Sequence, residues 1–291
     1  MNKRCLLLIS LAAFELGVST YAHGYESEIH QQLTFIAARQ FNACAQGQPD
    51  MYRLSALDTR YIVKANVGQA DGNFFVRMFR WHYYNREDQT NRSIWGIVDT
   101  RFHKHFDGLV EAVEKQDSHR GQLKSLGQLI SYIQKVSSPP NAVPVFSGRW
   151  WRFSMTDRFN RFPVDTARIE RAVSSICPEL QALDSGYQQI LTNTANETIA
   201  AVQSQIFGLP AAWTSFWKLA DKPNEFGEYG RAGNQFGSRT QFRCGDGERC
   251  LLLDRDPLYA DFAADRHEAA VLATMRAIMR FQMRQPEQAK Q

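Results

Sequence analysis

Arginine and aromatic side chains alternate in two segments of the 291-residue chain. The first segment covers residues 77–86, and the second covers residues 149–162. Guanidinium groups suit phosphates or carboxylates, and aromatic faces suit bases, sugars or lipid. The candidate anion-binding side chains are Arg80, Arg149, Trp150, Trp151 and Arg152 of these segments, together with Lys135. The alternative is a helical core from which the arginines extend outward to solvent.

Three other segments are informative when they are taken together. They are residues 27–30, which end in His30; residues 71–85, which contain Asp71 and His82; and residues 126–141, which contain Ser131, Lys135 and Asn141. Common catalytic signatures are missing from the sequence. It has no Gly-x-Ser-x-Gly elbow, no phosphate-binding P-loop and no His-Glu-x-x-His zinc helix.

In these three segments the chain resembles the family of zinc-dependent bacterial phospholipases C and fungal and plant single-strand nucleases. The resemblance implies an all-helical fold, a three-zinc cluster and hydrolysis of phosphodiesters. It also implies that the two arginine-aromatic segments border the metal cleft. The resemblance covers most of the chain up to about residue 165 and, more weakly, the last helix.

Most metal-ligand positions of that family hold other residues here. These residues are Ser131, Lys135, Asn141, Thr156 and Asn160. Hydroxyls and amides are poor zinc ligands, because zinc is bound by cysteine, histidine and carboxylate side chains. An ammonium at residue 135 would repel a divalent cation by on the order of several kcal/mol. The same ammonium can replace the metal charge and pair with Asp71, so the substitutions favour a site rebuilt without metal, and no cofactor is expected.

A reduced metal site is the alternative. The resemblance implies that His30, Asp71 and His82, with the amine of His23, would hold one zinc ion. The competing interpretation is that these histidines bind no metal and are ordinary core or exposed residues.

Residues 1–22 have the pattern of a secretory signal peptide. Lys3 and Arg4 precede a short apolar run, and Thr20-Tyr21-Ala22 supplies small residues at a cleavage site. The mature chain is therefore predicted to begin at His23 and to be periplasmic or secreted. We expect no transmembrane segment, because no later stretch approaches the roughly 20 apolar residues that a span needs. A net charge of +4 is too small to indicate nucleic-acid binding by itself.

Four cysteines remain after residue 22, and an even number in an exported chain indicates two disulfides. Cys244 and Cys250 flank a flexible polar stretch that can close a small ring, which leaves Cys44 to pair with Cys177. Half of a zinc site is the alternative for the first pair.

Apolar spacing predicts helices over residues 29–44, 106–116, 122–136, 178–207, 211–220 and 260–284. Pro139-Pro140 is predicted to end the third of these helices. Residues 222–256 are rich in Gly, Asn and Asp and are predicted to form an irregular, disulfide-containing loop insertion. The predicted fold class is all-α, with one multi-helix phospholipase C/nuclease-like domain over residues 23–291.

Three functions fit these patterns. The first is a catalytically degenerate binding protein, whose ligand is an anionic small molecule, a lipid headgroup or an exported protein. The second is a metal-dependent phosphodiesterase with a reduced metal site. The third is a protein that inhibits or chaperones an exported enzyme.

Overall fold

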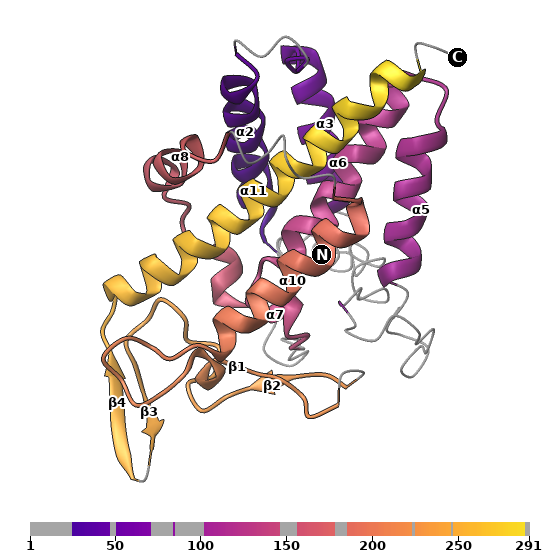
Figure 1. Cartoon of the computed structure of the whole chain (residues 1–291). Helices are drawn as coiled ribbons and strands as arrows, with labels where there is room; N and C mark the ends of the chain where they lie inside the picture. Colours follow the sequence, from indigo (N-terminus) through magenta and orange to yellow (C-terminus); the bar gives the residue numbers. More distant parts are fainter. Residues whose placement is uncertain are drawn as a thin grey trace, which may run out of the picture.

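The computed structural model describes residues 25–46, 51–70, 84, 102–145, 156–177, 185–222, 225–245 and 247–288. This part of the chain is mostly helical, with two small sheets (Figure 1). Its helices are α2 (Ser27–Cys44), α3 (Ala56–Ala70), α5 (Phe102–Lys115), α6 (His119–Val136), α7 (Pro139–Ala142), α8 (Thr166–Ser174), α10 (Tyr187–Gln203) and α11 (Pro257–Gln288). Its strands are β1 (Trp217–Lys218), β2 (Glu228–Tyr229), β3 (Thr240–Cys244) and β4 (Glu248–Leu252).

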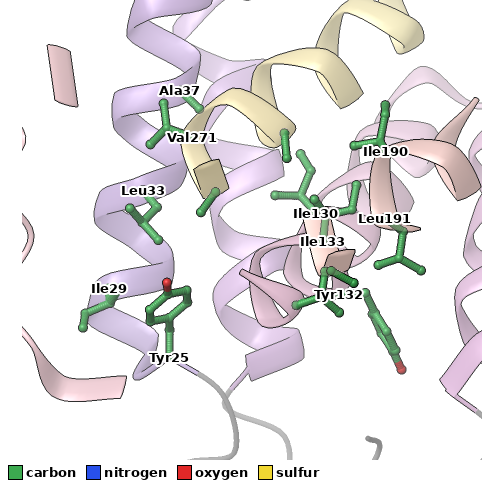
Figure 2. Packing of buried hydrophobic residues seen from close by; sticks show 14 of the residues in the cluster. Tyr25, Ile29, Leu33, Ala37, Ile130, Tyr132, Ile133, Ile190, Leu191 and Val271 are labelled. Atoms are coloured by element: carbon green, nitrogen blue, oxygen red, sulfur yellow. The ribbon is translucent and has the colours of Figure 1, made fainter. Parts of the chain in front are cut away.

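Helix α6 lies at the centre of the helical part and contacts α3, α5, α10 and α11. The predicted apolar face of this helix is fully buried, with Leu126, Leu129, Ile130 and Ile133 at 0% exposure. Figure 2 shows Ile130 and Ile133 beside the isoleucine and leucine of α10. A helix with neighbours on several sides needs little polar surface, and burial of this face supplies most of its stability.

Local sequence sets both ends of α6. The Ser118 hydroxyl accepts a hydrogen bond from the backbone N–H of Gly121, which caps the first turn. The helix ends at Val136, before Pro139-Pro140, as predicted. The two prolines then open α7, because a missing N–H is tolerated in the first turn of a helix.

The helices predicted over 29–44, 106–116, 122–136 and 260–284 are confirmed. Each begins two to four residues earlier than predicted, and α11 also ends later. The helix predicted to reach residue 207 ends earlier, at Gln203, where residues 204–213 turn back on themselves. The helix predicted over 211–220 is wrong. A single 3-10 turn at Trp213–Ser215 and strand β1 occupy that range instead.

The insertion over residues 222–256 is more ordered than the sequence indicates, so the described fold is mostly helical and not all-α. Strand β1 pairs with β2, and β3 pairs with β4, both antiparallel. Both strand pairs lie at one end of the helical part, with β3 and β4 near the start of α11 and β1 and β2 near the end of α10 (Figure 1). The sequence did not predict these strands, because each is only two to five residues long and too short to show a clear alternation of apolar and polar residues.

Both predicted disulfides are present. Cys44–Cys177 joins the end of α2 to the chain beyond α8, and Cys244–Cys250 joins β3 to β4. The first bond spans 133 residues and the second spans 6. Among the described helices, none is long and apolar enough to cross a membrane.

Helices α3 and α6 approach most closely at Gly127. A Cβ atom built there would lie 2.3 Å from the backbone oxygen of Ile62 and 2.8 Å from the Cβ of Ala65. Backbone cannot yield as a flexible side chain can, so any larger residue must force the helices apart.

We therefore expect Gly127→Ala to lower the free energy of unfolding by about 1–3 kcal/mol. Gly108→Ala is the matched control, because this exposed glycine lies on α5 with nothing within 4 Å of its built Cβ. The control should raise stability by about 0.5–1 kcal/mol through helix propensity. Urea unfolding measures both changes, and equal effects would contradict the close packing of α3 on α6.

Candidate functional site

The side chain of Gln134 joins four helices in the core. Its Oε1 atom lies 2.6 Å from Nδ1 of His30 on α2 and 3.1 Å from Nδ2 of Asn66 on α3. Its Nε2 atom donates to the hydroxyls of Thr34 on α2, at 3.0 Å, and Thr274 on α11, at 3.2 Å. All five residues are fully buried, so every donor and acceptor of the Gln134 amide is used inside the protein.

These bonds also fix the proton on His30. The Thr34 hydroxyl donates to the backbone oxygen of His30, and the Thr274 hydroxyl donates to that of Ala270. Each hydroxyl has one proton, so each must accept from Gln134, whose amide nitrogen therefore faces them. The oxygen then faces His30, which must donate from Nδ1 and keep its lone pair on Nε2.

Two buried imidazoles flank the ring of Tyr25. The ring centroids of His30 and His267 lie 5.8 and 5.3 Å from that of Tyr25. Burial lowers the pKa of His30 to about 4, with the nearby Lys135 charge adding to the effect and the Gln134 hydrogen bond opposing it. Burial alone lowers the pKa of His267 to about 3. Both rings are therefore neutral at physiological pH.

Lys135 follows Gln134 and is also buried, with 8% of its surface exposed. Burial lowers the pKa of its ammonium to about 8, so it remains mostly protonated at pH 7. The Nζ atom lies 5.3 Å from the ring centroid of Tyr132, a cation–π distance. Within the described part of the chain, no carboxylate forms an ion pair with Lys135.

Two neighbouring polar groups are also without partners among the described residues. They are the hydroxyl of Ser131 and the Nδ2 atom of Asn141. Ser131 lies one helical turn before Lys135 on the same face of α6, and Asn141 lies on α7, which follows directly. Leaving such donors buried and unbonded costs about 1–3 kcal/mol each. Ser131 and Asn141 therefore hold two buried donors that no described residue uses, and Lys135 adds a charge that no described carboxylate pairs.

Aromatic contacts connect this region to the segment predicted to border the cleft. Tyr132 contacts Phe102 of α5 at a centroid distance of 4.9 Å, and Phe102 contacts Tyr84 at 5.9 Å. Tyr84 belongs to the aromatic stretch 81–85 and is 4% exposed. One residue of that stretch thus lies two ring contacts away from the ring beside Lys135.

The start of α2 and residues 156–160 also lie close to the end of α6. The backbone N–H of Glu26, just before α2, donates to the backbone oxygen of Asn160. The Asn160 side chain accepts a 2.6 Å hydrogen bond from Ser138, and the Ser137 hydroxyl contacts the Tyr25 hydroxyl at 3.2 Å. The start of α2, the end of α6 and residues 156–160 therefore form one junction.

The sequence analysis missed the importance of Asp157. This buried carboxylate accepts hydrogen bonds from the Trp217 indole and the Tyr229 hydroxyl, both at 2.9 Å, and from the Phe159 backbone at 2.8 Å. Burial raises the pKa of Asp157, and these three bonds oppose that rise. Asp157 thereby fastens β1 and β2 to the junction. In the sequence, Asp157 is recognisable only as the neighbour of Thr156, and nothing there indicates that Trp217 and Tyr229 bind it.

Several predicted site residues lie outside the described residues. They are His23, Asp71, Arg80, His82, Arg149, Trp150, Trp151 and Arg152. Of the described residues at the ligand positions that the resemblance implies, His30 can bind zinc, whereas Lys135 and the hydroxyl and amide side chains are not zinc ligands and do not fit a zinc cluster. Among described residues, no three His, Cys, Asp or Glu side chains are grouped to hold a metal.

No protein-family profile, curated protein or solved structure shows significant similarity to this chain.

We expect Gln134→Leu to lower the free energy of unfolding by about 2–4 kcal/mol, because His30 and Asn66 would lose their buried acceptor. Gln128→Leu is the control on the same helix. Gln128 is half-buried and makes a 3.4 Å contact with Gln69, so its loss should cost less than about 1 kcal/mol. Denaturant unfolding of both variants is the measurement, and a Gln134 variant as stable as its control would contradict the network.

His267 should make stability depend on pH. The unfolded chain binds a proton near pH 6.5, whereas the folded chain resists it until about pH 3. The unfolded state therefore holds more protons in this window, and stability falls as pH decreases below 6.5. Relative to His267→Phe, the native protein should lose about 2–3 kcal/mol between pH 6.5 and 4.5, as measured by urea unfolding. Parallel pH profiles would show that His267 is solvated.

Proposed function

We propose that this protein is an exported binding protein that holds an anionic group against Lys135, in a phosphodiesterase-like frame that has lost its metal. The buried Lys135 ammonium carries the proposal. A buried charge is costly unless it is paired, and the described residues supply no carboxylate for it. An anion placed there would offset that cost.

The neighbouring groups favour an oxyanion. Ser131 and Asn141 each hold an unused buried donor, and an oxyanion accepts from several donors at once. Neutral His30 offers no competing positive charge, and its lone pair on Nε2 faces away from Gln134. The ligand classes that match are a carboxylate, a phosphate or the phosphate of a lipid headgroup.

The two disulfides support the proposal that the protein is exported. Such bonds persist in oxidising compartments and are rare in the cytosol. Together with the signal-like residues 1–22, they favour a periplasmic or secreted protein.

Lys135→Met keeps the length of the side chain and removes its charge. We expect this variant to bind the tightest of acetate, inorganic phosphate and glycerol phosphate at least about tenfold more weakly, as a lost charged hydrogen bond predicts. Lys124→Met is the control, because Lys124 is exposed on the same helix. Isothermal titration calorimetry measures the affinities.

The same variant separates ligand binding from a structural role. If Lys135 awaits a ligand, Lys135→Met should leave the unliganded protein as stable or more stable. If Lys135 instead pairs with Asp71, as the sequence also allows, removing it should cost about 3–5 kcal/mol. That loss, or unchanged anion affinity, would contradict the proposal.

A metal-dependent phosphodiesterase with a reduced metal site is the second candidate. One observation favours it. A histidine ligand commonly has its second nitrogen held by a hydrogen bond, as Gln134 holds Nδ1 of His30, while Nε2 remains unpartnered among the described residues. Zinc-dependent hydrolysis of bis(4-nitrophenyl) phosphate that disappears in His30→Ala would establish this function and overturn the first. No hydrolysis above the buffer rate would reject it.

A further inference from the structure

The disulfide-closed hairpin places two arginines directly opposite each other. Arg243 of β3 is the cross-strand partner of Arg249 of β4. Both side chains are exposed, because alternate residues such as Phe242 and Cys250 face the core. Like charges in this position destabilise a hairpin. Among the described residues, no acidic side chain forms an ion pair with either arginine, so no described carboxylate offsets the repulsion between them.

A third arginine lies beside this pair. Arg231 donates a long hydrogen bond, 3.4 Å, to the backbone oxygen of Arg243. Both arginines line a cleft of about 730 Å³ between the hairpin, the β1–β2 ribbon and the turn after α10. A volume of this size fits a small-molecule site.

The acidic group in the cleft lining is already paired. Glu228 accepts a 2.7 Å hydrogen bond from Lys218, its cross-strand partner. This pair cancels one positive charge and leaves the guanidinium groups of Arg231 and Arg243 uncompensated. The cleft therefore has a net positive charge, and Thr214 and Ser215 are among its lining residues.

Covalent and backbone constraints hold the walls in place. Cys244–Cys250 closes the hairpin. On the opposite wall, a Cβ at Gly230 would lie 2.3 Å from the backbone oxygen of Thr214 and 2.5 Å from that of Ser215, so the backbones are in close contact. A cleft with fixed walls loses little conformational entropy when a ligand binds.

We propose that this cleft is an anion-binding site, separate from Lys135, which takes a phosphate group between Arg231 and Arg243 while Arg249 adds its charge. The guanidinium fork matches phosphate oxygens in geometry and charge. The phosphate belongs either to a soluble compound or to a lipid headgroup. Leu251 and Leu253, 42% and 55% exposed, continue along the chain from Arg249 and would meet the lipid in the second case.

The first test is titration of the mature protein with inorganic phosphate at low ionic strength. Arg243→Gln should weaken binding about tenfold or more, the loss expected for a charged hydrogen bond. Arg239→Gln is the matched control, because it removes the same charge from an exposed position outside the cleft lining. The control should change affinity less than about twofold, as a screened distant charge does. These titrations are made in the Lys135→Met background, which lacks the Lys135 site, so that the phosphate binding that remains belongs to the cleft.

The second test uses vesicles of phosphatidylcholine with and without phosphatidylglycerol. Sedimentation with the anionic vesicles that depends on Arg243, without binding of free phosphate, would support the site and assign it to a lipid headgroup. Binding of free phosphate that depends on Arg243 would support the site and assign it to a soluble phosphate. Binding of neither probe, or equal losses in Arg243→Gln and Arg239→Gln, would overturn the proposal.

Discussion

The amide of Gln134 is the polar contact on which the helical core depends. It is the only side chain among the described residues that hydrogen-bonds to α2, α3 and α11 from α6, and its four hydrogen-bonding positions are all occupied. A buried network of this kind is stabilising only when it is complete. Because it is complete, α6 has one rotation about its axis, and that rotation determines where the next residue, Lys135, must lie.

Lys135 and Ser131 contrast with Gln134 on the same helix. Gln134 finds every partner within the core, whereas the Ser131 hydroxyl has none among the described residues. No described carboxylate pairs with the Lys135 ammonium. A buried polar group without a partner lowers stability, and this cost is the observation on which the proposed anion site rests. The apolar core that fixes α6 therefore also fixes the positions of the Ser131 hydroxyl and the Lys135 ammonium.

Sequence periodicity was sufficient for α2, α5, α6 and α11, because each has a long apolar face. The number and spacing of the cysteines were sufficient to predict both disulfides. Helix α3 was missed since only Ile62, Val63, Asn66 and Ala70 are buried on it, and an asparagine gives no apolar signal. The Gln134 network and the Asp157 contacts could not be predicted from the sequence either. Apart from the Phe159 backbone, every partner of these two side chains lies 60 or more residues away in the chain.

The central claim of the proposal is that the Lys135 ammonium lies at a position that the resemblance to zinc phosphodiesterases assigns to a metal ligand. Metal analysis of the protein, expressed with residues 1–22 in place and purified without a histidine tag, tests it most directly. The account predicts near-zero zinc, copper and manganese per chain. One or more equivalents of tightly held metal, lost in His30→Ala, would contradict it and show that neutral His30 serves as a ligand despite the neighbouring Lys135 charge.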